Sequence, residues 1–136
     1  SADGKRVVGS CQFDHSIHVW DTLTGDRLFS SLSDSTRVNT FSNHGYHVDW
    51  SPNSAKLLFC TYTPGGASSA VQVWSSESGE VERALLCGSA NPNAVKWTPS
   101  GDEIAVLSTN LNSILLLSAC TGRRVYTFMQ QEQLTE

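Results

Sequence analysis

The stretch DHSIHVWDTLTG at residues 14–25 joins a short apolar strand to a polar turn. Ile17 and Val19 alternate with other side chains and Trp20 ends the run, which is the composition and period of a β-strand. Gly25 closes the turn that follows. Two further stretches share this plan, each ending in a polar turn with glycine: AVQVW at 70–74 and SILLL at 113–117. The same strand and turn are therefore predicted three times.

Each of these strands lies inside a longer repeat. The turn signals SADG, SPNS and TPSG begin at residues 1, 51 and 98, and they are followed by the β-rich runs KRVVGSC, AKLLFCTY and DEIAVLS. After each central strand and its glycine turn come DRLFSSL, EVERALL and RRVYTF. HVDW at 47–50 and AVKW at 94–97 precede the second and third turn signals. Short strands in such a long period predict an all-β meander of four-stranded units.

The pattern resembles the WD-repeat family. The residues that carry the resemblance are SADGK at 1–5, Asp14, Ser16, Ile17, Val19, Trp20-Asp21 and Thr24-Gly25. The resemblance implies a β-propeller in which Asp14, Ser16 and Trp20 belong to a hydrogen-bonded network within the blade, with Trp74 as the tryptophan of the second copy. The later copies depart from the family pattern: Ser75 follows Trp74, Leu117 replaces the tryptophan, and Ser89 follows Gly88 where Gly-His is usual.

The resemblance divides the chain into about two and three-quarter four-stranded antiparallel blades, against four to eight in a closed propeller. Blade one spans 1–33 without its innermost strand, blade two spans 34–87, blade three spans 88–129, and 130–136 form a polar tail. Alternating apolar residues at both ends are expected to need a covering face: Val7, Ile17, Val19, Ile104, Val106, Leu115 and Leu117. We therefore expect the chain to be a sector of a larger ring, completed by a longer parent chain, by further copies or by a different subunit.

Composition excludes several classes of function. The net charge is −4 and the basic residues are scattered, so no footprint for nucleic acid is present. No apolar run approaches the roughly 20 residues that cross a bilayer, so membrane insertion is not expected. Four cysteines without a C-x-x-C pair, Cys11, Cys60, Cys87 and Cys120, are expected to be reduced thiols of an intracellular protein, cytoplasmic or nuclear.

Two His-x-x-His spacings occur, His15/His18 and His44/His47. Residues three apart on a strand point to opposite faces, so neither pair is expected to chelate a metal, and His18 and His47 are expected to face solvent. No nucleophile elbow, zinc-protease motif or phosphate-binding loop is present. We expect neither a cofactor nor enzymatic activity.

Two connections of blade two are longer than their counterparts, SDSTRVNTFSNHGY at 33–46 and the loop around TPGGASS at 63–69. In the family topology both loops emerge on one face, and variable loops on a rigid scaffold often carry recognition. The candidate partner-binding residues are Arg37, Phe41, His44, Tyr46, Tyr62 and Pro64. We expect a non-catalytic protein–protein interaction scaffold within a larger assembly, binding another protein or a peptide. The alternative is a regulatory or targeting WD-repeat domain of a larger enzyme or ATPase.

Overall fold

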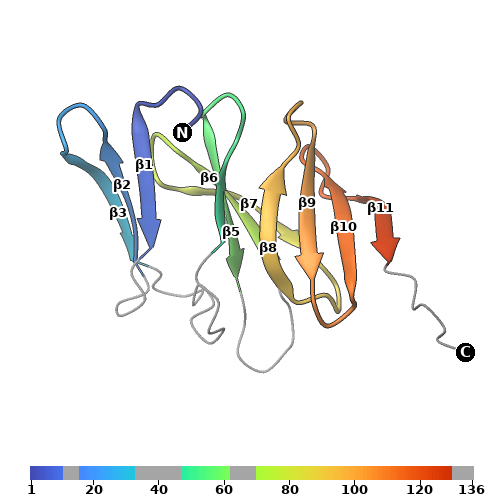
Figure 1. Cartoon of the computed structure of the whole chain (residues 1–136). Coiled ribbons are helices and arrows are strands. Elements are labelled where there is room, and N and C mark those ends of the chain that lie inside the picture. Colours follow the sequence, from blue (N-terminus) through green and yellow to red (C-terminus); the bar gives the residue numbers. More distant parts are fainter. Residues whose placement is uncertain (11–15, 33–46, 62–69, 130–136) are drawn as a thin grey trace, which may run out of the picture.

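A computed structural model describes residues 1–10, 16–32, 47–61 and 70–129 (Figure 1). Within these ranges the chain is all-β and forms three antiparallel sheets. The described residues include no helical segment with the length and apolar character needed to cross a bilayer.

The strands follow one another along the chain and pair with their sequence neighbours. The first sheet contains β1 (Arg6–Ser10), β2 (Ser16–Asp21) and β3 (Arg27–Leu32). The second contains β4 (Val48–Trp50), β5 (Lys56–Thr61), β6 (Ala70–Ser75) and β7 (Val81–Leu86). The third contains β8 (Pro92–Trp97), β9 (Glu103–Ser108), β10 (Ser113–Ser118) and β11 (Arg124–Met129). Each predicted strand is therefore present, in a meander of the predicted order.

The same turn closes the hairpin between the last two strands of each sheet. Gly25, Gly79 and Gly122 have φ angles of 75°, 73° and 72°. Each glycine donates its amide hydrogen to the carbonyl oxygen four residues earlier, at 3.0, 3.0 and 2.8 Å. This left-handed backbone conformation is one that glycine adopts without steric cost. The repeated glycine in the sequence therefore has a repeated backbone role.

A β-bulge also recurs at one place in all three sheets. The register shifts opposite Val19/Trp20, Val73/Trp74 and Leu116/Leu117. One extra residue results on each outer strand, namely Leu28, Glu82 and Val125. A bulge bends its strand and redirects side chains, so it changes what these three positions can contact.

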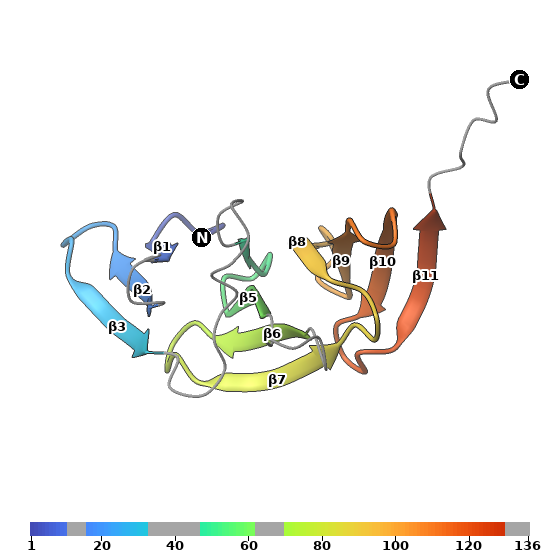
Figure 2. The ribbon, with the colours of Figure 1, turned by 90° about the horizontal axis from the view of Figure 1, so that it is seen from below.

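The three sheets stand side by side in an arc (Figure 2). Strands β3, β7 and β11 lie along the outside of the arc, whereas β1, β5 and β8 lie nearer its inner side. One apolar core joins the first two sheets through Ile17, Val19, Leu57, Phe59 and Trp74. A larger core joins the second and third sheets and includes Leu58, Val71, Val73, Ile104, Val106, Leu115 and Leu117.

The expectation about uncovered residues was largely wrong. Six of the seven residues expected to lack cover are buried between the sheets: Ile17, Val19, Ile104, Val106, Leu115 and Leu117. Only Val7 is exposed, by 50%. Alternation shows which residues share a face of a strand, but it does not show which of the two faces meets the neighbouring sheet.

Candidate functional site

The predicted partner-binding residues lie outside the described residues, and so does Asp14 of the predicted blade network. These positions are Arg37, Phe41, His44, Tyr46, Tyr62 and Pro64. The remaining network residues, Ser16, Trp20 and Trp74, are described and lie on the central strands β2 and β6.

Ser16, His18 and Trp20 lie on one face of β2, because residues two apart on a strand share a face. Ser16 is buried, and its Oγ lies 2.6 Å from Nε2 of His18. The rings of His18 and Trp20 are 5.5 Å apart. The expectation that His18 faces solvent was wrong, because His18 is half-buried. His47 is exposed, as expected. The difference in exposure arises because His18 packs between Ser16 and Trp20 on the same face of β2.

Trp74 is the equivalent residue of the second sheet, and it faces the first sheet. Its Nε1 donates a hydrogen bond to Oε1 of Gln72 at 2.9 Å, and its ring meets Phe59 edge-on at 5.3 Å. Gln72 precedes Trp74 by two residues, as His18 precedes Trp20. In both sheets the polar side chain next to the tryptophan therefore comes from the same strand. Trp74 belongs to the core between the first two sheets, whereas Trp20 lies on the opposite face of β2 from Ile17 and Val19 of that core.

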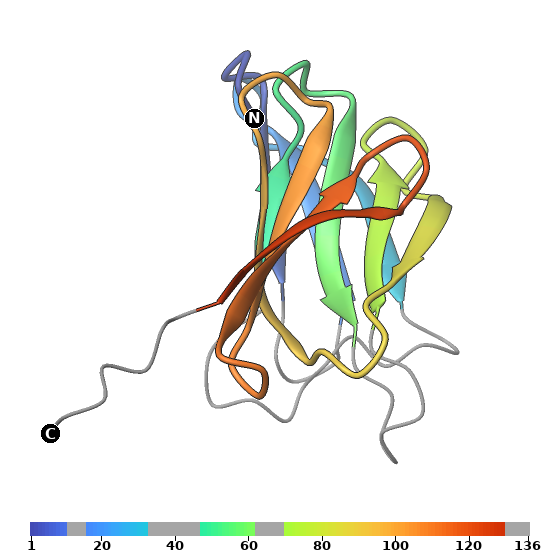
Figure 3. The ribbon, with the colours of Figure 1, turned by 90° about the vertical axis from the view of Figure 1, so that its right-hand side faces the viewer.

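One face of the third sheet carries exposed apolar side chains, and no described strand lies against this face (Figure 3). Leu107 and Phe128 flank Ile114 in the register, and Tyr126 is paired with Leu116. Tyr126 and Phe128 are 58% and 52% exposed, and their rings lie 4.7 Å apart. This set, Leu107, Ile114, Leu116, Tyr126 and Phe128, is called the outer face below. Contiguous apolar surface of this kind is typical of an interaction site.

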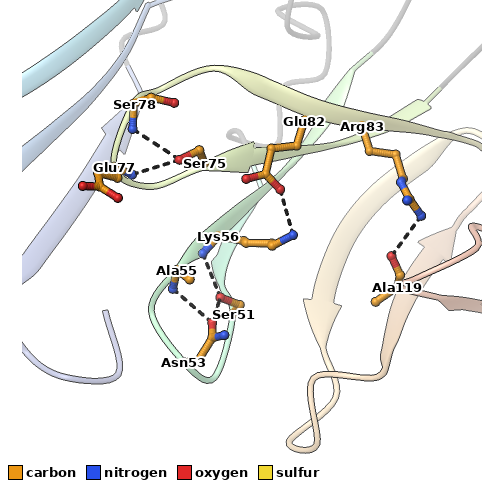
Figure 4. A network of polar contacts seen from close by, with 10 residues as sticks. All are labelled: Ser51, Asn53, Ala55, Lys56, Ser75, Glu77, Ser78, Glu82, Arg83 and Ala119. Carbon is orange, nitrogen blue, oxygen red and sulfur yellow. Dashed lines mark hydrogen bonds and ion pairs between the residues drawn. The ribbon is translucent and has the colours of Figure 1, made fainter.

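A cavity of about 510 Å³ opens between the second and third sheets. Its charged lining residues are Lys56, Glu82 and Arg83. Nζ of Lys56 lies 2.7 Å from Oε2 of Glu82, and Nη1 of Arg83 donates to the carbonyl oxygen of Ala119 at 3.5 Å (Figure 4). Figure 4 shows Glu82 and Arg83 extending from β7 toward Lys56 and Ala119. The cavity therefore has a polar wall built by the second sheet.

The bulge of β7 places two consecutive charged residues at this wall. In a regular strand Glu82 and Arg83 would point to opposite faces. Here both line the cavity, because Glu82 is the extra residue of the bulge. The corresponding extra residues of the other sheets, Leu28 and Val125, are apolar and exposed. The charged pair therefore occurs in the second sheet alone among the three repeats.

The junction between the first and second sheets is filled differently at the equivalent place. Arg6 is the counterpart of Lys56, and its Nη1 donates to the carbonyl oxygen of Ser76 at 2.8 Å and to Oγ of Ser76 at 3.1 Å. Phe29 is the counterpart of Arg83, and its ring lies directly against Gly79. An arginine and a phenyl ring thus occupy the space that the second junction leaves open.

Thiol chemistry is not supported at two of the cysteines. Burial raises the pKa of Cys60 to about 12 and also raises the pKa of Cys87. Both thiols therefore stay protonated near neutral pH and are poor nucleophiles. Cys120 is exposed and lines the cavity. Over the ranges that the structure describes, no three His, Cys, Asp or Glu side chains form a group suited to a metal ion.

Sequence reasoning did not identify the cavity residues Lys56, Glu82, Arg83 and Trp97. The signal available was the repeat itself: aligning the turn signals places Lys56 opposite Arg6 and Glu103, so the position is polar in every copy but different in each. The bulge that brings Glu82 beside Arg83 has no signature in the sequence. No protein-family model matches this chain.

Proposed function

We propose that this chain is a non-catalytic protein–protein interaction scaffold, built as a sector of a WD-repeat β-propeller. The resemblance of DHSIHVWDTLTG to the WD repeat supports the propeller assignment, and the three stacked sheets are compatible with it. In this proposal the three sheets are blades, and the outer face is where another protein or a further blade packs.

One observation carries the proposal. Ile17 and Val19 of β2 pack against the second sheet, and Val71 and Val73 of β6 pack against the third. The equivalent residue of β10 is Ile114, which is 41% exposed. The third sheet therefore presents to solvent the positions that the other two sheets use to bind their neighbour. In a stack of repeats each copy buries this face against the next one, and a terminal copy needs a cap. We therefore expect another protein or a further blade to cover the face of the third sheet.

The proposal is tested by capture of partners from cell extract with the tagged chain. A scaffold is expected to retain at least one protein in a stoichiometric amount. Ile114→Lys places a charge on the outer face and is expected to abolish capture. The matched control is Leu23→Lys, because Leu23 is 93% exposed in a turn away from this face. Recovery of the unaltered chain alone would contradict the scaffold, and equal capture by both variants would exclude the outer face.

A further inference from the structure

We propose that the cavity between the second and third sheets binds an acidic peptide segment, with a carboxylate next to an apolar side chain. This inference rests on the proposed function, because it names the kind of partner that the scaffold recognises. The site differs from the outer face: it lies between two described sheets and is lined from both.

The charges of the lining favour an anion. Lys56 and Arg83 are cationic and Glu82 is anionic, which gives the cavity a net charge of +1 on a chain whose net charge is −4. Lys56 is already paired with Glu82 at 2.7 Å. Arg83 has one hydrogen bond to the described residues, the 3.5 Å contact with Ala119. A guanidinium has five N–H donors in a planar fork, so Arg83 can still bind a carboxylate through two of them.

A buried tryptophan lies in the same lining. Trp97 is only 8% exposed, and its Nε1 has no hydrogen-bond partner among the described residues. Its backbone N–H donates to Oδ2 of Asp49 at 2.7 Å, which fixes the position of the residue. A buried donor without an acceptor is costly, and this nitrogen is closed to solvent, so the part of Trp97 that lines the cavity adds to its apolar wall.

Apolar residues complete the lining and select the ligand. Pro52, Val73 and Ala119 line the cavity together with the indole of Trp97. The volume of about 510 Å³ lies within the range typical of ligand sites. A bare inorganic anion would leave these walls in contact with water. A peptide that offers an acidic and an apolar side chain matches both parts of the site.

The comparison between the two junctions explains why only one of them has this character. Arg6 donates two hydrogen bonds to Ser76 at the first junction. At the second junction the counterpart of Ser76 is Ala119, which has no hydroxyl group, and Lys56 pairs with Glu82 instead. The opening between the second and third sheets therefore results from specific substitutions at repeat positions.

The test is a titration of the 136-residue chain, ¹⁵N-labelled, with two synthetic peptides, acetyl-Leu-Glu-Leu-amide and acetyl-Leu-Gln-Leu-amide. The indole N–H resonance of Trp97, assigned with Trp97→Phe, is expected to shift with the acidic peptide. The amide peptide is expected to bind at least about tenfold more weakly, because a charge-assisted hydrogen bond is replaced by a neutral one. Equal affinities, or no shift with either peptide, would overturn the proposal.

Two variants locate the interaction. Arg83→Met is expected to weaken binding of the acidic peptide at least about tenfold. Arg124→Met makes the same change on β11, outside the cavity lining, and is expected to leave affinity unchanged. Equal losses in both variants would contradict the site. If Arg83→Met does not fold, the comparison of the two peptides on the unaltered chain still decides.

Two further measurements distinguish a peptide site from a general anion site, and the cavity from the scaffold as a whole. Inorganic phosphate at the concentration of the peptide is expected not to displace it, and full displacement would instead indicate a general anion site and overturn the proposal. If the unaltered chain does not bind the acidic peptide while Arg83→Met still captures partners undiminished, the cavity site is overturned and the scaffold stands. Peptide binding by a chain that captures no protein would support the cavity and contradict the scaffold.

Discussion

Lys56 and Glu82 form an ion pair across the second sheet, with Nζ and Oε2 2.7 Å apart, at the place where Arg6 of the first sheet reaches its neighbour instead. Lys56 begins β5 and Glu82 is the extra residue of the bulge in β7. The pair therefore lies within one sheet and does not connect the second sheet to the third. Because Lys56 pairs within its own sheet, it does not bridge the space between the second and third sheets, where the cavity lies. The contribution of the pair to the free energy of unfolding can be measured.

The ion pair is expected to contribute little to folding. Both side chains are about two-fifths exposed, at 43% and 40%, so water screens the attraction. A double-mutant cycle with Lys56→Met and Glu82→Gln is expected to give a coupling free energy of about 0.2–1 kcal/mol in urea unfolding, decreasing with added salt. A coupling of several kcal/mol would indicate a desolvated pair and would contradict the exposure of these side chains.

Gly79→Ala is expected to destabilise the chain more than Gly25→Ala. Both glycines have a left-handed backbone, at φ 73° and 75°, which costs a non-glycine residue about 1–2 kcal/mol. A Cβ at Gly79 would also lie 2.6 Å from Cδ2 of Phe29, whereas nothing lies within 4 Å of a Cβ at Gly25. Displacing Phe29 adds about 1–3 kcal/mol.

Thermal and urea unfolding of the two glycine variants measure this difference. Equal losses of stability would show that Phe29 moves aside without cost. Phe29→Ala in the Gly79→Ala background is expected to remove the additional penalty, because it removes the ring that the new methyl group meets.

Local features of the fold were predictable, because neighbouring residues determine them. The strands at 16–20, 70–74 and 113–117 follow from β-branched and apolar runs, and the turns at Gly25, Gly79 and Gly122 follow from glycine at a fixed distance. These elements need only the chemistry of adjacent positions.

The direction in which each face points was not predictable. Leu115 was expected to lack cover and Ile114 was not, yet Leu115 is fully buried and Ile114 is exposed. The two residues are neighbours on β10 and face opposite ways, so only the position of the second sheet distinguishes them. The cavity was not predictable either, because Glu82 and Arg83 both line it only as a result of the bulge in β7.

Leu115→Ala is expected to cost about 2–5 kcal/mol of unfolding free energy, because it leaves a void in the core between the second and third sheets. Leu107→Ala is the matched control, since Leu107 is 40% exposed on the other face of the same sheet. It is expected to cost about 1 kcal/mol or less in the isolated chain. Denaturant unfolding that ranks the two variants in the opposite order would contradict the assignment of the faces.

Alkylation is expected to distinguish the cysteines. At about pH 8.5 a thiol with an ordinary pKa is partly thiolate, whereas Cys60 with a pKa of about 12 stays protonated. In a Cys11→Ser background, iodoacetamide is expected to label Cys120 rapidly and to leave Cys60 and Cys87 unlabelled until the chain unfolds. Peptide mapping by mass spectrometry identifies the labelled sites. Rapid labelling of Cys60 under native conditions would contradict its burial.

Asp21 is expected to make the stability of the first sheet pH-dependent. Backbone amides of Thr24 and Leu23 donate to Oδ1 of Asp21 at 3.0 and 2.8 Å, and they hold its pKa below the ordinary value of 3.8. Because the folded-state pKa is the lower one, the stabilisation is present above about pH 4 and is lost as the pH falls through the folded-state value. Asp21→Ala is therefore expected to lower the melting temperature at neutral pH, and this deficit is expected to shrink as the pH falls below 3.8. Circular dichroism melts of both proteins across this interval measure the difference, and a deficit that stays constant with pH would show that the charge of Asp21 does not stabilise the turn.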